Sequence, residues 1–104
     1  MRAPETIIRA ALKRISNPER WCARNAARNA RNEPVPPHSP EAVRWCAMGA
    51  LQAESTTHEE YRRAKLMFGE ESLIRVNDKE GHQAVLDLFD AALGRAELLA
   101  EDHR

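Results

Sequence analysis

The carboxy-terminal fifth of the chain carries the pattern that most restricts the fold. Between about Gly81 and Ala100, apolar side chains recur every three or four positions, which is the period of an α-helix with one buried face. The members of this stripe are Val85, Leu88, Phe89, Ala92, Leu93, Ala96 and Leu99. A helix with one apolar face has to pack against other elements, so the pattern predicts a helical domain.

A second stripe of the same period follows Pro4, a residue that suits the first turn of a helix because its missing N–H costs nothing there. Its members are Ile7, Ile8, Ala11, Leu12 and Ile15. A proline after a capping side chain marks two further helix starts, at residues 17–19 and 39–41. Thr57 and Glu60 have the spacing of a capping box, which predicts a fourth helix from about His58.

The composition supports helices over strands, because 17 alanines stand beside only four glycines. We therefore expect an all-α fold: a compact single domain over residues 1–104, with four to five helices and a proline-rich connector at about 33–40. Two segments stay open: residues 23–32 could be helix or loop, and 69–80 contain both helical and turn signals. We expect the Asn77-Asp78 pair to act in a turn that leads into the last helix.

Several side chains should form the core where the predicted stripes meet. Gly49 costs about 1 kcal/mol relative to alanine inside a helix, and close approach of another helix would offset this cost. The side chains expected to be buried are Trp21, Cys46, Ala50, Leu51, Phe89 and Leu93.

No apolar run approaches the roughly 20 residues of a membrane span, and the first residues do not resemble a secretory signal peptide. These observations predict a cytoplasmic protein that does not enter a membrane. In that compartment Cys22 and Cys46 should be reduced and buried thiols, although the sequence also allows them to pair.

The net charge of zero hides an asymmetry along the chain. Residues 1–31 contain eight Lys or Arg against two Glu, a net charge of +6, so the remainder carries −6. Four of these cations, Arg20, Arg24, Arg28 and Arg31, have the spacing of successive helical turns. If the segment is helical, they form a basic ridge that suits an acidic protein surface or a row of phosphates. The alternative is a solvated face that pairs with the acidic half of the same chain.

Catalytic signals are weaker. A Cys-His-Asn hydrolase site could assemble from Cys46, Asn77 and either His58 or His82. Against this, Cys46 is expected six residues inside its helix, beyond the reach of the helix dipole. The histidines and cysteines lack the spacings of common metal sites, and no phosphate-binding loop is present, so we assign no metal ligand, cofactor or catalytic residue.

Three short motifs follow one another in a distinctive order along the chain. They are Trp21-Cys22, then Trp45-Cys46 continuing through Gly49 to Leu51, and then Asn77-Asp78 ahead of Gly81. This order resembles a family of small uncharacterised bacterial and phage proteins with W-C, W-C-A-x-G-A-L and N-D-x-x-G motifs. The resemblance covers roughly residues 15 to 95 and implies no activity.

We therefore predict a small helical binding module or regulator whose basic amino-terminal face, through Arg20, Arg24, Arg28 and Arg31, meets an acidic protein partner. The alternatives are the hydrolase built on Cys46 and a nucleic-acid-binding domain that uses the same arginines. A homo-oligomer is also left open.

Overall fold

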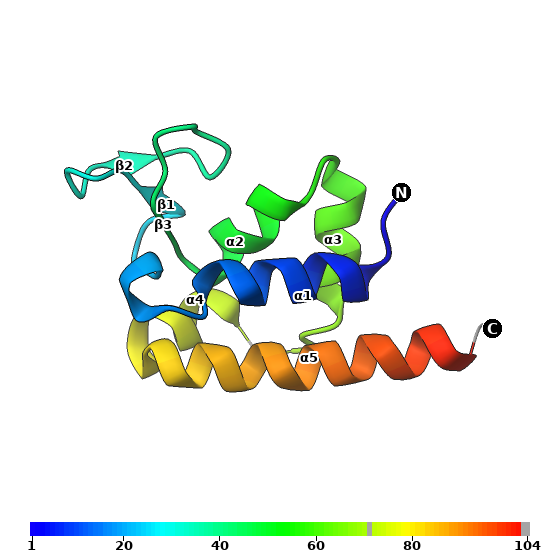
Figure 1. Cartoon of the computed structure of the whole chain (residues 1–104). Coiled ribbons are helices and arrows are strands. Elements are labelled where there is room, and N and C mark those ends of the chain that lie inside the picture. Colours follow the sequence, from blue (N-terminus) through cyan, green and yellow to red (C-terminus); the bar gives the residue numbers. More distant parts are fainter. Residues whose placement is uncertain (71, 103–104) are drawn as a thin grey trace.

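Two long helices form the base of the fold. The computed structural model describes residues 1–70 and 72–102. Helix α1, Pro4–Ile15, runs alongside helix α5, His82–Asp102, in the opposite direction (Figure 1). Proline stands at the start of α1, and Ile7, Ile8 and Ile15 are fully buried. The predicted stripe of α1 is thus confirmed. The stripe of α5 is confirmed at Val85, Phe89, Ala92 and Ala96, whereas Leu88 and Leu93 are partly covered and Leu99 is exposed.

Two shorter helices pack across α1. Helix α2, Ala47–Glu54, and helix α3, His58–Leu66, both contact it. The predicted cap of α3 is confirmed, because Thr57 Oγ1 accepts a hydrogen bond from the Glu60 N–H at 3.1 Å. Helix α2 begins later than the predicted start at residues 39–41. There, Ser39 accepts from Glu41 N–H in a turn, and the chain then continues as a strand.

Residues 18–45 correct the all-α prediction. Only one 3-10 turn, η1 (Pro18–Arg20), follows α1, and the chain then forms a small antiparallel sheet of order β2-β1-β3. Its strands are β1 (Ala27–Arg28), β2 (Pro34–Val35) and β3 (Arg44–Trp45). Ala27 lies opposite both Val35 and Trp45.

Turn chemistry explains why residues 23–32 do not form a helix. The Asn29 side-chain oxygen accepts hydrogen bonds from the N–H groups of Arg31 and Glu33, which closes the loop between β1 and β2. Arg24 and Asn32 have positive φ angles of 76° and 65°, which no helix accommodates. Short polar side chains in this segment therefore satisfy the local backbone in place of helical hydrogen bonds.

The segment before α5 is helical but irregular. Helix α4, Leu73–Arg75, is followed directly by a π-helical turn, η2, Val76–Glu80, and Gly81 with φ of 93° ends it. The expectation that Asn77 and Asp78 lie in a simple turn is therefore wrong, because both belong to η2. Single π-helical turns are rare and are often found at functional sites.

The core lies between α1, α2, α3 and α5. Phe68 and Phe89 meet edge to face with ring centroids 4.9 Å apart. Of the six side chains expected to be buried, Ala50, Leu51 and Phe89 are, whereas Trp21, Cys46 and Leu93 are only partly covered. The radius of gyration, 13.0 Å, is that of a compact domain of about 100 residues. No helix in the described residues combines the length and apolar character of a membrane span.

Candidate functional site

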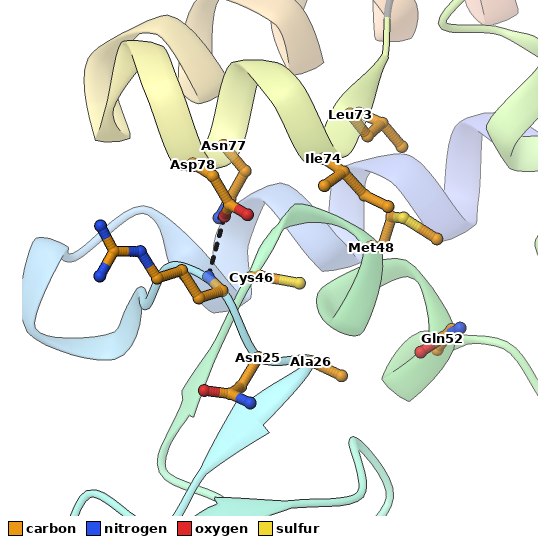
Figure 2. Close-up of a pocket in the computed structure, with 10 residues that line it drawn as sticks. Asn25, Ala26, Cys46, Met48, Gln52, Leu73, Ile74, Asn77 and Asp78 are labelled. Atoms are coloured by element: carbon orange, nitrogen blue, oxygen red, sulfur yellow. Dashed lines mark hydrogen bonds between the residues drawn. The ribbon is translucent and has the colours of Figure 1, made fainter.

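A pocket of about 220 Å³ lies where the start of the sheet meets α2, α4 and η2 (Figure 2). It collects three residue types that the sequence had singled out: an arginine of the predicted ridge, a cysteine and the Asn-Asp pair. Its lining residues are Arg24, Asn25, Ala26, Cys46, Met48, Gln52, Leu73, Ile74, Asn77 and Asp78. Met48, Leu73 and Ile74 give it an apolar wall, and Ile74 is 58% exposed. We call it the Cys46 pocket.

Cys46 occupies the N-cap position of α2, with its sulfur accepting a hydrogen bond from the Gly49 N–H at 3.3 Å. The expectation that it lies deep inside a helix is therefore wrong, because β3 ends directly before it. Burial raises the pKa of the Cys46 thiol, and the Gly49 N–H opposes that rise. The thiol is thus held largely protonated at neutral pH.

Gly49 is required by close packing, as predicted, but its neighbour is extended backbone and not a helix. A Cβ at this position would lie 1.8 Å from the Ala26 carbonyl oxygen. The same oxygen accepts the Cys46 N–H at 3.1 Å. The glycine thereby allows the first turn of α2 to lie against the chain that enters β1, which brings together Ala26 and Cys46, two residues that line the pocket.

Asn77 connects three remote segments and is almost fully buried, so the reading of this residue as a turn-former is wrong. Its oxygen accepts hydrogen bonds from Trp21 Nε1 at 2.7 Å and from Ala47 N at 2.9 Å. Its Nδ2 group donates to the Cys22 carbonyl at 3.1 Å and to Asp78 Oδ1 at 3.1 Å. Every hydrogen-bonding group of this buried amide is therefore satisfied.

Asp78 holds Arg24 in its unusual backbone conformation, with Oδ1 accepting the Arg24 N–H at 2.8 Å (Figure 2, dashed line). A left-handed conformation costs roughly 1–2 kcal/mol for a residue other than glycine. The pocket is thus bordered by a strained residue and by a π-helical turn, two features that concentrate at functional sites. The Arg24 guanidinium has no hydrogen bond or ion pair within residues 1–70 and 72–102.

The four arginines of the predicted ridge do not share one helical face. Arg20 lies in η1, with its guanidinium carbon 5.6 Å from the centre of the Trp45 ring. Arg28, in β1, donates to the Asn32 carbonyl at 2.8 Å. Arg31 is exposed in the β1–β2 loop, so only Arg24 reaches the pocket.

The hydrolase constellation is brought together only in part. Cys46 and Asn77 both line the pocket, but Asn77 is occupied by its structural hydrogen bonds. His82 donates from Nε2 to the Ile15 carbonyl at 2.7 Å and lies against Trp21. His58 lies against Tyr61 and lines a different pocket of about 260 Å³.

The two cysteines are free thiols. Cys22 is buried and donates to the Asn25 carbonyl at 3.5 Å. Burial, helped by the nearby Cys46, raises the pKa of Cys22 to about 11. Among the described residues, His, Cys, Asp and Glu side chains do not gather in threes at a point that could hold a metal ion.

Sequence reasoning singled out Arg24, Cys46 and Asn77, which line the pocket, but not its apolar wall. Leu73 and Ile74 stand in residues 69–80, whose structure the sequence left open, and Met48 stands in a helix beside the predicted core residues Ala50 and Leu51. A wall assembled from α2 and α4 depends on how the two helices pack, which residue spacing alone does not report.

Comparison with known proteins returned no match among curated proteins and none among solved structures. A family match begins at residue 1, so it takes in α1 as well as the region of the W-C motifs. The sequence model of DUF6197, a family of unknown function, matches residues 1–95, and the chain therefore belongs to that family.

Proposed function

We propose that this protein is a small binding module that takes an acidic protein segment, with one apolar side chain of the partner seated in the Cys46 pocket. The proposal depends on one observation: an apolar wall and Arg24 line the same pocket. The Arg24 guanidinium makes no hydrogen bond or ion pair to any described residue. The proposal gives the pocket no chemistry of its own.

The size of the pocket supports an anchor side chain over a metabolite. Sites for drug-sized ligands run from about 300 to 1,000 Å³. At about 220 Å³ this pocket suits a single aliphatic side chain, and in many interfaces a few residues seated in well-packed pockets contribute most of the binding energy. The exposed Ile74 at its edge extends the apolar contact beyond the pocket.

The charge around the pocket supports an acidic partner. Arg24 belongs to the amino-terminal 31 residues, whose net charge is +6. Among the described residues that line the pocket, only Asp78 is acidic, and its Oδ1 already accepts hydrogen bonds from the Arg24 N–H and the Asn77 amide. A carboxylate beside the anchor would therefore meet a guanidinium that is free to pair with it.

The test uses a labelled peptide, acetyl-Glu-Glu-Leu-Glu-Glu-amide, in fluorescence anisotropy. Two matched peptides separate the two contributions: one replaces Leu with Ser and the other replaces each Glu with Gln. We expect saturable binding of the first peptide, and binding weaker by about fivefold or more for each of the others, which corresponds to ~1 kcal/mol.

Protein variants locate the interaction. Arg24→Ala and Ile74→Ser should each weaken binding by about fivefold, because each removes one contact from an exposed position. Arg62→Ala is the matched control, since Arg62 lies on α3 and pairs with Glu59. Equal losses in all three variants, or equal binding of the three peptides, would refute the proposal. Tight binding of duplex DNA that depends on Arg24 would move the protein to the nucleic-acid class.

A further inference from the structure

A second site lies where the end of α1 meets η1 and the end of α2. A concavity of about 350 Å³ is lined by Ala10, Lys13, Arg14, Arg20 and Glu54. Three of these residues are cations from the amino-terminal part of the chain and one is a carboxylate, so the lining carries a net charge of +2. We call this concavity the Lys13 site.

Two of the three cations lie against one aromatic ring. The guanidinium carbons of Arg14 and Arg20 lie 4.5 Å and 5.6 Å from the centre of the buried Trp45 ring. Attraction to the ring stabilises each guanidinium by about 0.5–2 kcal/mol. It also holds two like charges close to a common point, which is unfavourable unless an anion lies nearby.

The chain supplies only part of that negative charge. Glu54 Oε2 accepts from Arg14 at 2.7 Å for Nε and 2.5 Å for the terminal nitrogen, and both side chains are largely buried. The Lys13 ammonium and the Arg20 guanidinium have no hydrogen bond or ion pair to any described residue. Both side chains are exposed and border the same concavity.

We propose that the Lys13 site binds a doubly charged phosphate group. The two uncompensated charges of Lys13 and Arg20 match hydrogen phosphate or a phosphate monoester, which carries about −1.5 to −2 near neutral pH. A carboxylate or a nucleic-acid phosphodiester carries only −1. The guanidinium fork of Arg20 can donate two parallel hydrogen bonds to phosphate oxygens, and Lys13 adds a point charge.

The experiment measures the thermal midpoint of the full chain against increasing inorganic phosphate at pH 7.5, with ionic strength held constant by sodium chloride. A ligand that binds only the native state raises the midpoint in a saturable way. Dimethyl phosphate and acetate, each with one charge, should bind about tenfold more weakly. Inorganic phosphate is compared with N-acetyl-phosphoserine amide, and the tighter of the two identifies a free ion or a phosphorylated side chain as the source.

Variants keep the test specific. Lys13→Ala leaves the two guanidinium contacts with Trp45 in place, so it should fold normally and weaken phosphate binding by about tenfold. Arg20→Ala removes one of those contacts, so it should lower the thermal midpoint without phosphate slightly and weaken phosphate binding by a similar factor. Arg62→Ala on α3 should retain the phosphate response, as should Ile74→Ser in the Cys46 pocket. The last variant separates this site from the proposed peptide site.

Three outcomes overturn the proposal. The first is an equal response to phosphate, dimethyl phosphate and acetate, and the second is an unchanged response in Lys13→Ala and Arg20→Ala. The third is duplex DNA binding that depends on Arg20 while inorganic phosphate gives no shift, which would assign the cluster to nucleic acid.

Discussion

At the scale of single residues, Asn77 illustrates how a polar side chain can organise a fold. Its amide joins Trp21 in the segment after α1, the chain at Cys22, and the first residue of α2. A buried amide with four partners contributes specificity, because any loosening of one segment leaves a polar group unpaired. Asn77, which itself lines the Cys46 pocket, therefore also fixes the positions of the segments that form the walls of the pocket.

Replacing Asn77 by alanine should lower the free energy of unfolding by on the order of 3 kcal/mol. The change leaves the Trp21 N–H, the Ala47 N–H and the Cys22 carbonyl without their partner, and each unsatisfied buried group costs about 1–3 kcal/mol. Urea denaturation at neutral pH measures the loss. A loss below about 1 kcal/mol would mean that the network does not hold these segments together.

Asn77→Asp keeps the size and shape of the side chain, and the pH dependence of its stability tests the hydrogen-bond network of Asn77. A carboxylate there would face the Cys22 carbonyl and the Asp78 carboxylate, so its pKa in the folded state should rise above the unfolded value of about 3.9. The protonated acid can donate to Cys22, so the loss of stability should be smaller at pH 5 than at pH 7. An identical loss at both pH values contradicts the hydrogen-bond assignment.

At the scale of elements, two glycines in helices have opposite roles. Gly49 in α2 lies against the Ala26 carbonyl, whereas Gly94 in α5 is exposed and a Cβ there would meet no atom within 4 Å. Glycine costs about 0.5–1 kcal/mol in a helix interior. Packing offsets that cost at Gly49, and nothing in the described chain does so at Gly94.

The same substitution should thus have opposite signs at the two positions. Gly94→Ala should raise the free energy of unfolding by about 0.5–1 kcal/mol through helix propensity. Gly49→Ala should lower it by more than about 3 kcal/mol, because backbone has to move. Thermal and urea denaturation of both variants measure the effects, and a neutral Gly49→Ala would show that α2 and the backbone of Ala26 are not held in contact.

The start of α3 should respond to acid. Hydrogen bonds from the Thr56 hydroxyl and N–H and from the Arg2 N–H lower the pKa of buried Glu60 from 4.5 to about 2. A lowered pKa gives stability that is fully present above pH 4.5 and is lost as the pH falls toward 2.

Glu60→Gln should therefore reduce stability at neutral pH and flatten its decline between pH 4.5 and 2. Stability measured by urea denaturation across that range provides the check. Glu59→Gln is the neighbouring control. Glu59 is only partly buried and its pKa is lowered by hydrogen bonds from Arg62, so the effect of this substitution should be smaller. A slope unchanged by Glu60→Gln contradicts this assignment.

The elements that the sequence predicts well are those set by local signals. The stripes of α1 and α5 and the Thr57 cap depend on spacing within one segment, and all three are observed. The sheet depends on pairing between residues far apart, such as Ala27 with Trp45, and strands of two residues leave no periodic pattern. Proline at residue 40 signalled a helix start, but tertiary pairing of Arg44 and Trp45 displaced that start to Ala47.

At the scale of the whole molecule, α1 is the centre of the fold, in contact with α2, α3 and α5, and the small sheet stands at one end (Figure 1). The two proposed sites involve neighbouring residues of the chain, since Cys46 lines one and Trp45 contacts Arg14 and Arg20 at the other. The positive charge of the amino-terminal third is thus divided between two separate places, Arg24 at one and Lys13 with Arg20 at the other.

The basic character of the amino-terminal third could be predicted from composition, but the arrangement of its arginines could not. Helical spacing placed Arg20, Arg24, Arg28 and Arg31 in one row, whereas the positive φ of Arg24 and the β1 strand at Arg28 separate them. Arg14 and Arg20 meet at the ring of Trp45, which lies against the end of α1, and Lys13 borders the same concavity.

Protection of the Cys46 thiol tests the central claim, an anchor pocket without chemistry, most directly. Cys46 lines the pocket, and burial raises its pKa, so iodoacetamide should react slowly with it at neutral pH and more slowly still with buried Cys22. Alkylation of each cysteine is followed by mass spectrometry at increasing concentrations of acetyl-Glu-Glu-Leu-Glu-Glu-amide. We predict saturable slowing at Cys46 by the Leu peptide and none by its Ser counterpart. Rapid alkylation of Cys46 that rises steeply near pH 7, or a rate unaffected by the Leu peptide, would contradict the account and favour a reactive cysteine.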